Sequence, residues 1–308
     1  MRIIITGGSG MIGKALAIEL IEAGHEVIVL SRNPFPGIVP GGVGVEKWDA
    51  ETSHGWASLI TEDTAIVNFA GAGLAEGRWT DERKAEILKS RINAGQAVVD
   101  GIQSADSKPR VVIQASAVGY YGPRGDEELT ESSSSGDDFL ADVCQQWEEA
   151  TQPVEEMGIR RAITRSGVVL STKDGAFPRM LLPFKLFVGG PIGSGQQWMP
   201  WIHIHDEVRA VRFLIENEAS QGVYNLTAPN PVTNGQFATI MGNVMRRPGI
   251  VPVPAFVMQT LFGELSTVLL DGQRAVPHRL LEEGFTFEYN ELEAAIRDLL
   301  DRPAPAAA

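Results

Sequence analysis

The chain has 308 residues, of which 44% are hydrophobic and 21% are charged, a profile typical of a folded globular protein. The formal net charge is -13, and the sequence contains no cluster of basic residues. Such a protein repels nucleic acids and anionic membrane surfaces, so we expect neither as a partner. No apolar run approaches the roughly 20 residues that span a bilayer. The opening Met1 to Ile5 is too short for a secretory signal, and the single cysteine, Cys144, fits a reducing compartment. We therefore expect a cytoplasmic protein.

Apolar runs of strand length alternate with amphipathic helical stretches through the first two thirds of the chain. This alternation is typical of βαβ units and a parallel sheet. We predict seven strands, at residues 2–6, 26–31, 44–48, 65–70, 110–115, 160–166 and 222–226. A helix should run from Met11 to Glu22 and end at Gly24.

The alternation breaks between residues 171 and 201, where glycines and prolines surround an apolar cluster at 180–184. The chain should then return to the sheet for a helix near 206–216 and the last strand. Helical stretches at 237–245 and 291–300 follow. The predicted fold is α/β, with a Rossmann-type doubly wound parallel sheet and a smaller C-terminal substrate lobe. The expected domains are a Rossmann domain of 1–170 plus 204–228, a substrate lobe of 171–203 plus 229–300, and a disordered tail of 301–308.

A glycine-rich turn lies directly between the first strand and the first helix. Residues 6–13 read TGGSGMIG. Glycines permit a tight turn and a close approach to a pyrophosphate, and the helix N-terminus supplies N–H donors. The residues expected to contact the cofactor here are Gly7, Gly10, Met11 and Ile12, while Gly13 allows close helix–strand packing. A glycine-rich turn without a ligand is the alternative, but its place at the start of an α/β chain favours binding.

The second strand ends at Ser31 and Arg32, where an NAD-specific protein usually carries an acidic residue for the ribose 2'-hydroxyl. A guanidinium can instead pair with a 2'-phosphate, and Ser31 could donate a further hydrogen bond. The cofactor predicted from these residues is NADP(H). A solvated surface arginine is the alternative.

Two further strand ends offer candidate cofactor contacts. Asp49 follows the third strand and could accept a hydrogen bond from the adenine amino group, or could cap its own loop. Phe69, Ala70 and Gly71 follow the fourth strand, where small residues would let the cofactor lie across the strand ends. Plain tight packing would explain the same residues.

Several segments together resemble the short-chain dehydrogenase/reductase superfamily. They are the turn at 6–13, GRWT at 77–80, SR at 90–91, ASAVGYYG at 115–122, GSGQ at 193–196, WIHIHD at 201–206 and the late run from Gly263 to Pro277. The closer resemblance is to the extended and atypical NAD-dependent epimerase/dehydratase branch, in a subgroup with a C-terminal domain of unknown function. The resemblance implies that Ser116 and the turn of Arg165, Gly167 and Val168 lie beside the nicotinamide.

The catalytic pattern departs from that superfamily, in which a tyrosine transfers a proton, a lysine lowers its pKa and a serine positions the substrate oxygen. Ser116 fills the serine position. Alignment on Glu148 puts Leu140 in the tyrosine position and Cys144 in the lysine position. Tyr120 and Tyr121 are the nearest substitutes for the missing acid, although tyrosines in this loop could also pack or contact ligand.

A second departure concerns the substrate. Nucleotide-sugar members of the family carry an arginine that clamps the diphosphate, and Met199 stands in that position. Trp198, Met199 and Trp201 could form an apolar wall for the substrate or pack between the lobes.

Two functions are compatible with these observations. The first is an NADP(H)-dependent oxidoreductase or epimerase-like enzyme for a small carbonyl or alcohol, with Ser116, Tyr120 or Tyr121 as the catalytic groups. The second is a non-catalytic NADPH-binding sensor or structural protein, which the missing tyrosine and lysine favour. The sequence predicts no metal site.

Overall fold

A seven-stranded parallel sheet forms the centre of the molecule in the computed structural model, which describes residues 1–35 and 37–301. The strand order is β11-β7-β5-β4-β1-β2-β3, that of a doubly wound fold. The strands are β1 (Arg2–Thr6), β2 (Glu26–Ser31), β3 (Gly44–Lys47), β4 (Thr64–Asn68), β5 (Val111–Ala117), β7 (Arg160–Ser166) and β11 (Gly222–Leu226). All seven predicted strands are confirmed, four of them with the predicted bounds.

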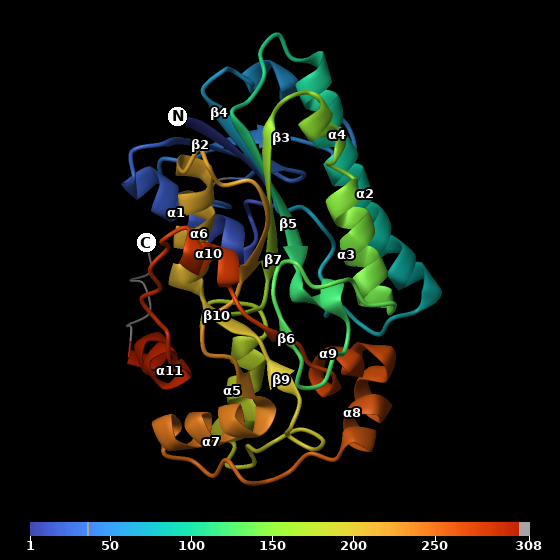
Figure 1. Ribbon diagram of the computed structural model, residues 1–308, viewed down its shortest axis with the longest axis vertical. Helices are drawn as coiled ribbons and strands as arrows, with labels where there is room; N and C mark the ends of the chain where they lie inside the picture. Colours follow the sequence, from blue (N-terminus) through green and yellow to red (C-terminus); the bar gives the residue numbers. More distant parts are fainter. Residues whose placement is uncertain (36, 302–308) are drawn as a thin grey trace.

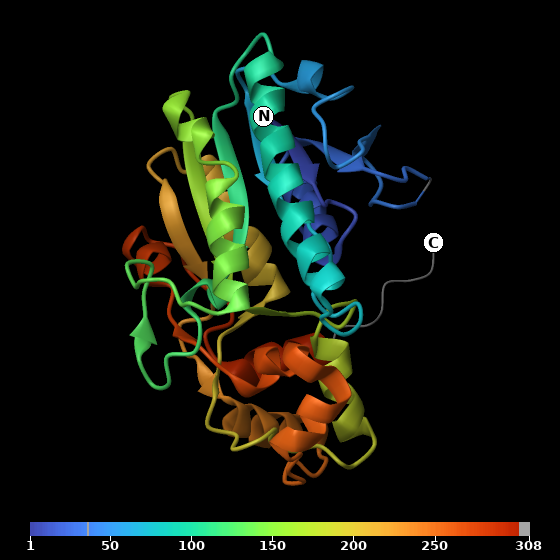
Figure 2. The same cartoon turned by 90° about the vertical axis from the view of Figure 1, so that its right-hand side faces the viewer.

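Helices cover both faces of this sheet (Figures 1 and 2). One face carries α1 (Met11–Glu22) and α6 (Ile204–Glu216). The other carries α2 (Asp81–Ser104), α3 (Phe139–Glu149) and α4 (Pro153–Glu156). Because the strands are buried on both sides, their sequences are continuous apolar runs; Ile3, Ile4 and Ile5 are completely buried.

Short elements connect these layers. They are the 3-10 helices η1 (Ala57–Leu59) and η2 (Val118–Tyr121), and the strand β6 (Glu128–Leu129), which pairs with β13 (Arg274–Ala275). Helix α10 (His278–Glu282) follows β13. Leu280, Phe285 and Phe287 pack into the same core as α1 and α6, so this late segment lies against the sheet.

A second group of elements lies beyond the carboxyl ends of the strands, in the lower part of Figure 1. It contains β8 (Val168–Leu170), α5 (Phe177–Lys185), β9 (Trp198–Met199), β10 (Trp201–His203), β12 (Val232–Thr233), α7 (Asn234–Met245), α8 (Ala255–Phe262), η3 (Gly263–Ser266), α9 (Thr267–Leu270) and α11 (Leu292–Asp301). A core of its own includes Phe177, Trp201, Phe237 and Ile296. The predicted site residues lie at or just after the carboxyl ends of β1, β2, β3, β4, β5 and β7.

Two sequence expectations concern the limits of the described chain. The predicted tail, 301–308, lies outside the described residues except for Asp301, which ends α11. Among residues 1–35 and 37–301, no helix is both long enough and apolar enough to cross a membrane.

Candidate cofactor and active site

The glycine turn presses closely against the end of β4. Gly7 has a positive φ of 67°, and a β-carbon there would lie 2.7 Å from the carbonyl carbon of Phe69. A β-carbon at Gly13 would lie 2.5 Å from the Cα of Gly8. Gly10 is the N-cap of α1 and provides no capping side chain, so the first N–H groups of the helix receive no bond from one. The turn therefore has the shape and the donors that an anionic ligand requires.

A buried polar chain lies directly below the turn and was not assigned from the sequence. Thr6 Oγ1 donates to Asn68 Oδ1 at 2.6 Å, and Asn68 Nδ2 donates to Gln114 Oε1 at 2.9 Å. Thr6 Oγ1 also accepts from the Ala70 N–H at 3.2 Å. These residues stand in register on β1, β4 and β5, and their bonds fix the three strand ends relative to one another.

The two residues expected to recognise a 2'-phosphate lie at the end of β2. Ser31 is buried, and the exposed Arg32 side chain makes no hydrogen bond or ion pair with the described residues. Asp49 has local partners: it accepts from the N–H groups of Glu51 and Thr52 at 2.9 and 2.8 Å. Burial acts to raise the pKa of Asp49, but these bonds and the bond from the Thr52 hydroxyl together outweigh it and lower the pKa. The arrangement favours the loop-capping alternative for Asp49.

Ser116 belongs to a buried network that reaches from β5 to α3 and β7. Its Oγ donates to Glu148 Oε1 at 2.6 Å. Arg165 stands beside Ser116 in the register of β5 and β7, and it pairs with both oxygens of Glu148, at 2.8 and 2.9 Å. Arg165 is only 3% exposed. Its guanidinium, which was expected beside the nicotinamide, is therefore already paired with the Glu148 carboxylate inside the protein.

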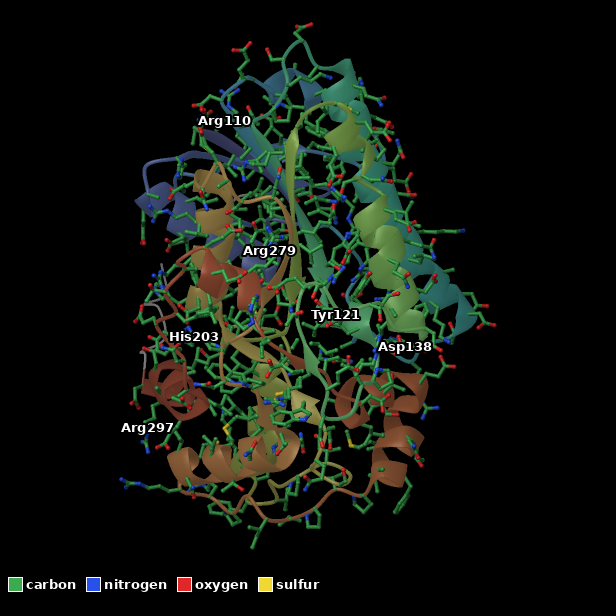
Figure 3. The ribbon with its side chains drawn as sticks, in the orientation of Figure 1. Arg110, Tyr121, Asp138, His203, Arg279 and Arg297 are labelled. Carbon is green, nitrogen blue, oxygen red and sulfur yellow. The ribbon has the colours of Figure 1, made fainter. Side chains whose placement is uncertain are left out.

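Tyr121 extends the same network. Its side chain is completely buried, and its hydroxyl donates to Asn225 Oδ1 at 2.7 Å and accepts from Arg165 Nη1 at 3.1 Å. Burial raises the pKa of Tyr121 to about 12. Tyr120 is half-buried, and its ring centroid lies 3.3 Å from the Cζ of Arg165. Figure 3 shows Tyr121 near the lower ends of the strands, with Asp138 at the start of α3 beside it.

Helix α3 offers no group for proton transfer in the two positions that the superfamily uses. Leu140 packs against η2, where a β-carbon at Gly119 would lie 3.3 Å from its Cβ. The Cys144 thiol is buried, and burial, reinforced by Glu148, raises its pKa to about 11. It is therefore a neutral thiol at physiological pH.

The turn after β7 leads the chain out of the sheet. Gly167 N–H donates to Leu226 O at 3.0 Å, and Val168 N–H donates to Pro200 O at 2.7 Å. A β-carbon at Gly167 would lie 2.6 Å from that same Pro200 oxygen. Of the predicted apolar wall, Met199 and Trp201 belong to the core, whereas Trp198 is half-buried and bonds Asp126.

A second buried carboxyl lies at the end of β7 and was also missed. Glu207 on α6 is 1% exposed and accepts from Ser166 Oγ at 2.7 Å, while its Oε2 has no hydrogen-bond partner in the described chain. Burial raises its pKa to about 8, against the opposing effect of Ser166. Its neighbour Asp206 accepts from the N–H groups of Glu288 and Tyr289 and so anchors the segment before α11.

Within the described ranges, no group of three or more His, Cys, Asp or Glu side chains is placed to hold a metal ion.

The sheet order and the glycine turn define a doubly wound α/β protein of the Rossmann type. Residues 3–227 match the model of the NAD dependent epimerase/dehydratase family, and residues 253–299 match a domain of unknown function, DUF1731. The chain belongs to the NAD dependent epimerase/dehydratase family, as the resemblance implied.

Similar proteins cover almost the whole chain. The epimerase family protein YfhF of Bacillus subtilis is 42% identical over 301 residues, which are 97% of this chain and 98% of the relative. A chloroplastic homologue of SDR39U1 in Arabidopsis thaliana is 40% identical, with coverage of 97% and 87%. The crystal structure of human SDR39U1 with NADPH superposes with a TM-score of 0.88 at 37% identity, covering 97% of this chain and 99% of the human one.

Proposed function

We propose that this protein binds NADP(H) and acts as an oxidoreductase or epimerase-like enzyme on a small carbonyl or alcohol. The observation that carries the cofactor assignment is Arg32, an exposed guanidinium without a protein partner in the described chain, one strand away from the glycine turn. A planar, unpaired guanidinium at this strand end fits a 2'-phosphate. The human relative whose crystal structure contains NADPH is 37% identical, which supports the same assignment.

The bound cofactor supplies or accepts a hydride, and the chain's own residues hold and orient the reactants. The amides of the glycine turn bind the pyrophosphate. Because Ser116 donates its own proton to Glu148, the lone pairs of Ser116 remain to accept a hydrogen bond from a substrate hydroxyl. Tyr121 has both its donor and its acceptor bond inside the protein, so Tyr120 is the tyrosine left to face a substrate.

The second candidate is an NADPH-binding protein without turnover, such as a sensor. It is favoured by Leu140 and Cys144 in the positions of the catalytic tyrosine and lysine, and by the engaged hydroxyl of Tyr121. In such a protein the cofactor would stabilise a conformation rather than react.

Arg32→Ala tests the cofactor assignment. Loss of a charge-assisted phosphate contact should weaken NADPH roughly 10- to 100-fold, measured by titration calorimetry. NADH, which lacks the 2'-phosphate, should bind with nearly unchanged affinity. Arg297→Ala, a substitution on the exposed face of α11, controls for the general loss of a positive charge. An equal loss for both cofactors would overturn the 2'-phosphate assignment.

A screen of carbonyl compounds for NADPH oxidation separates the enzyme from the sensor. For any compound that reacts, Ser116→Ala should abolish turnover while NADPH still binds, and Tyr121→Phe should keep turnover. Absence of oxidation across aldehydes, ketones and sugars, in a protein that binds NADPH, would favour the sensor.

A further inference from the structure

Residues 255–270 form a mostly apolar segment that joins none of the hydrophobic cores of the described chain. The segment consists of α8, η3 and α9, and we call it the strap. The structure describes all of its residues, and only Met258 and Ser266 are buried, while large apolar side chains such as Phe256 and Leu261 are exposed. A segment that buries so little surface opens more readily than the sheet does.

The strap is fixed at its two ends. Just before it, the Val253 carbonyl accepts from the Gly193 N–H at 2.8 Å. Near its other end, Gln197 Nε2 donates to the Leu269 carbonyl at 2.9 Å. Gly263 separates α8 from η3, with a φ of 60° and nothing within 4 Å of a β-carbon placed there. The middle of the strap is therefore able to move while both ends stay in place.

Two cations from the other part of the molecule hold the middle of the strap. Arg78 donates from Nε and Nη2 to the Leu261 carbonyl at 3.3 and 3.2 Å, and its Nη2 also donates to the Thr260 carbonyl. These carbonyls lie at the C-terminal end of α8, where the helix dipole favours a positive charge. Lys84 forms an ion pair with Glu264. We call these contacts of Arg78 and Lys84 the latch.

The latch is close to solvent. Arg78 is exposed, and the Glu264 side chain is 59% exposed. Contacts between exposed charged groups shift an equilibrium only modestly. The latch therefore favours the closed position of the strap but leaves it reversible, as a gate requires.

The strap lies beside the expected place of the nicotinamide. A cofactor with its 2'-phosphate at Arg32, after β2, and its pyrophosphate at the glycine turn, after β1, must extend its other half over β4 and β5. Arg78 comes from the loop after β4, and Lys84, at the start of α2, lies 5.1 Å from the ring centroid of Phe139 at the start of α3. Figures 1 and 2 both show α8 just below the lower ends of α2 and α3.

We propose that the strap is a lid on the substrate side of the nicotinamide, closed by the latch of Arg78 and Lys84. This inference rests on the proposed NADP(H) function. The closed lid keeps water from the reduced nicotinamide, and the open lid admits the carbonyl or alcohol substrate. It gives a role to the first part of the region at 253–299 that matches a domain of unknown function.

Hydrogen exchange followed by mass spectrometry measures the opening of the strap in the free protein. We expect Arg78→Ala to speed exchange within residues 255–270 roughly 5- to 20-fold, with the exchange of the sheet unchanged. Arg83→Ala is the matched control, because Arg83 holds the same loop through the Gly73 carbonyl and Glu76 but makes no bond to the strap in the described chain. It should change the exchange of the strap less than about twofold.

A charge exchange tests the second contact of the latch. Lys84→Glu places a like charge against Glu264 and should speed exchange of the strap by a few-fold. Adding Glu264→Lys restores opposite charges and should slow the exchange again. Exchange that stays fast in the double variant would remove the ion pair from the latch.

Bound NADPH tests whether the strap acts as a lid. In the wild-type protein, saturating NADPH should slow exchange within residues 255–270, and acrylamide should quench the fluorescence of the bound nicotinamide only weakly. Arg78→Ala should raise the quenching constant roughly 3-fold or more, whereas Arg83→Ala should leave it unchanged.

Unchanged exchange of the strap in Arg78→Ala would overturn the latch. Equal quenching of NADPH in the wild-type protein and in Arg78→Ala, at saturating NADPH, would overturn the lid. Wild-type protein that binds no NADPH refutes the proposed function, and in that case the exchange of the free protein still decides whether the latch holds the strap.

Discussion

The two ends of the candidate site are built in different ways. The phosphate region, which comprises Gly7, Gly10, Gly13 and Arg32, consists mainly of backbone from one short turn and its neighbouring strand end. The buried polar network, which comprises Ser116, Tyr121, Glu148, Arg165 and Asn225, joins side chains from five separate elements. A site built from local backbone leaves a motif in the sequence, whereas a site built from distant side chains does not.

The largest effect should come from breaking the buried network. Glu148→Ala leaves Arg165 buried without its acid, which should cost about 3–5 kcal/mol of unfolding free energy in a urea titration. Glu293→Ala is the matched control, because Glu293 and Arg297 are both exposed and their ion pair should contribute about 0–1 kcal/mol. Similar losses in the two variants would show that the network is no more important than a surface pair.

In the phosphate region, Gly7→Ala should weaken NADPH and NADH alike by about 100-fold, because it combines a positive φ with a clash against Phe69. Gly24→Ala carries a comparable φ of 84° but has nothing within 4 Å of a β-carbon. That control should lower stability and leave cofactor affinity unchanged. Unaltered NADPH binding in Gly7→Ala would show that the turn does not hold the cofactor.

Glu207 should make stability depend on pH. Its pKa rises from an ordinary 4.5 to about 8 on folding, so the native protein holds a proton that the unfolded chain releases. The contribution of Glu207 to the free energy of unfolding is therefore greatest at a pH below 4.5, the pKa of this group in the unfolded chain. It falls as pH rises from 4.5 to about 8, by up to ~1.4 kcal/mol per pH unit. Glu207→Gln should flatten this slope in urea titrations across the range, and an unchanged slope would refute the assignment.

The smallest effect should come from Tyr121→Phe, which removes one donated and one accepted hydrogen bond. We expect a loss of about 1–2 kcal/mol in unfolding free energy, with cofactor affinity unchanged. Tyr120→Phe should leave stability within about 0.5 kcal/mol, since its hydroxyl forms no hydrogen bond with the described residues. A loss of cofactor affinity in Tyr121→Phe would place that hydroxyl in the binding site instead of the buried network.

The sequence predicted the sheet well because each strand is an apolar run bounded by turn residues, a local signal. β1, β2, β7 and β11 have the predicted bounds, whereas β4 ends earlier and β5 later than predicted. Residues after β4 are apolar but turn away from the strand to meet Gly7, and hydrophobic periodicity carries no signal for that turn. The seven strands and the glycine turn are therefore predictable from short stretches of sequence.

Much of the remaining site could not be predicted in this way, for a physical reason. Glu148 and Arg165 are 17 residues apart, and Tyr121 and Asn225 are 104 apart, so only the folded sheet brings them together. Glu207 looks like an ordinary charged helix residue in the sequence, and its burial comes from packing against other elements. The register of β5 with β7 would have been the useful signal, because it places Ser116 beside Arg165.

Titration of the wild-type protein with NADPH, followed by the fluorescence of the reduced nicotinamide at modest ionic strength, tests the central claim most directly. We expect saturable binding of one NADPH per chain, tighter than that of NADH in a parallel titration. No saturable binding, or tighter binding of NADH, would contradict the claim that the glycine turn and Arg32 together hold a 2'-phosphorylated dinucleotide.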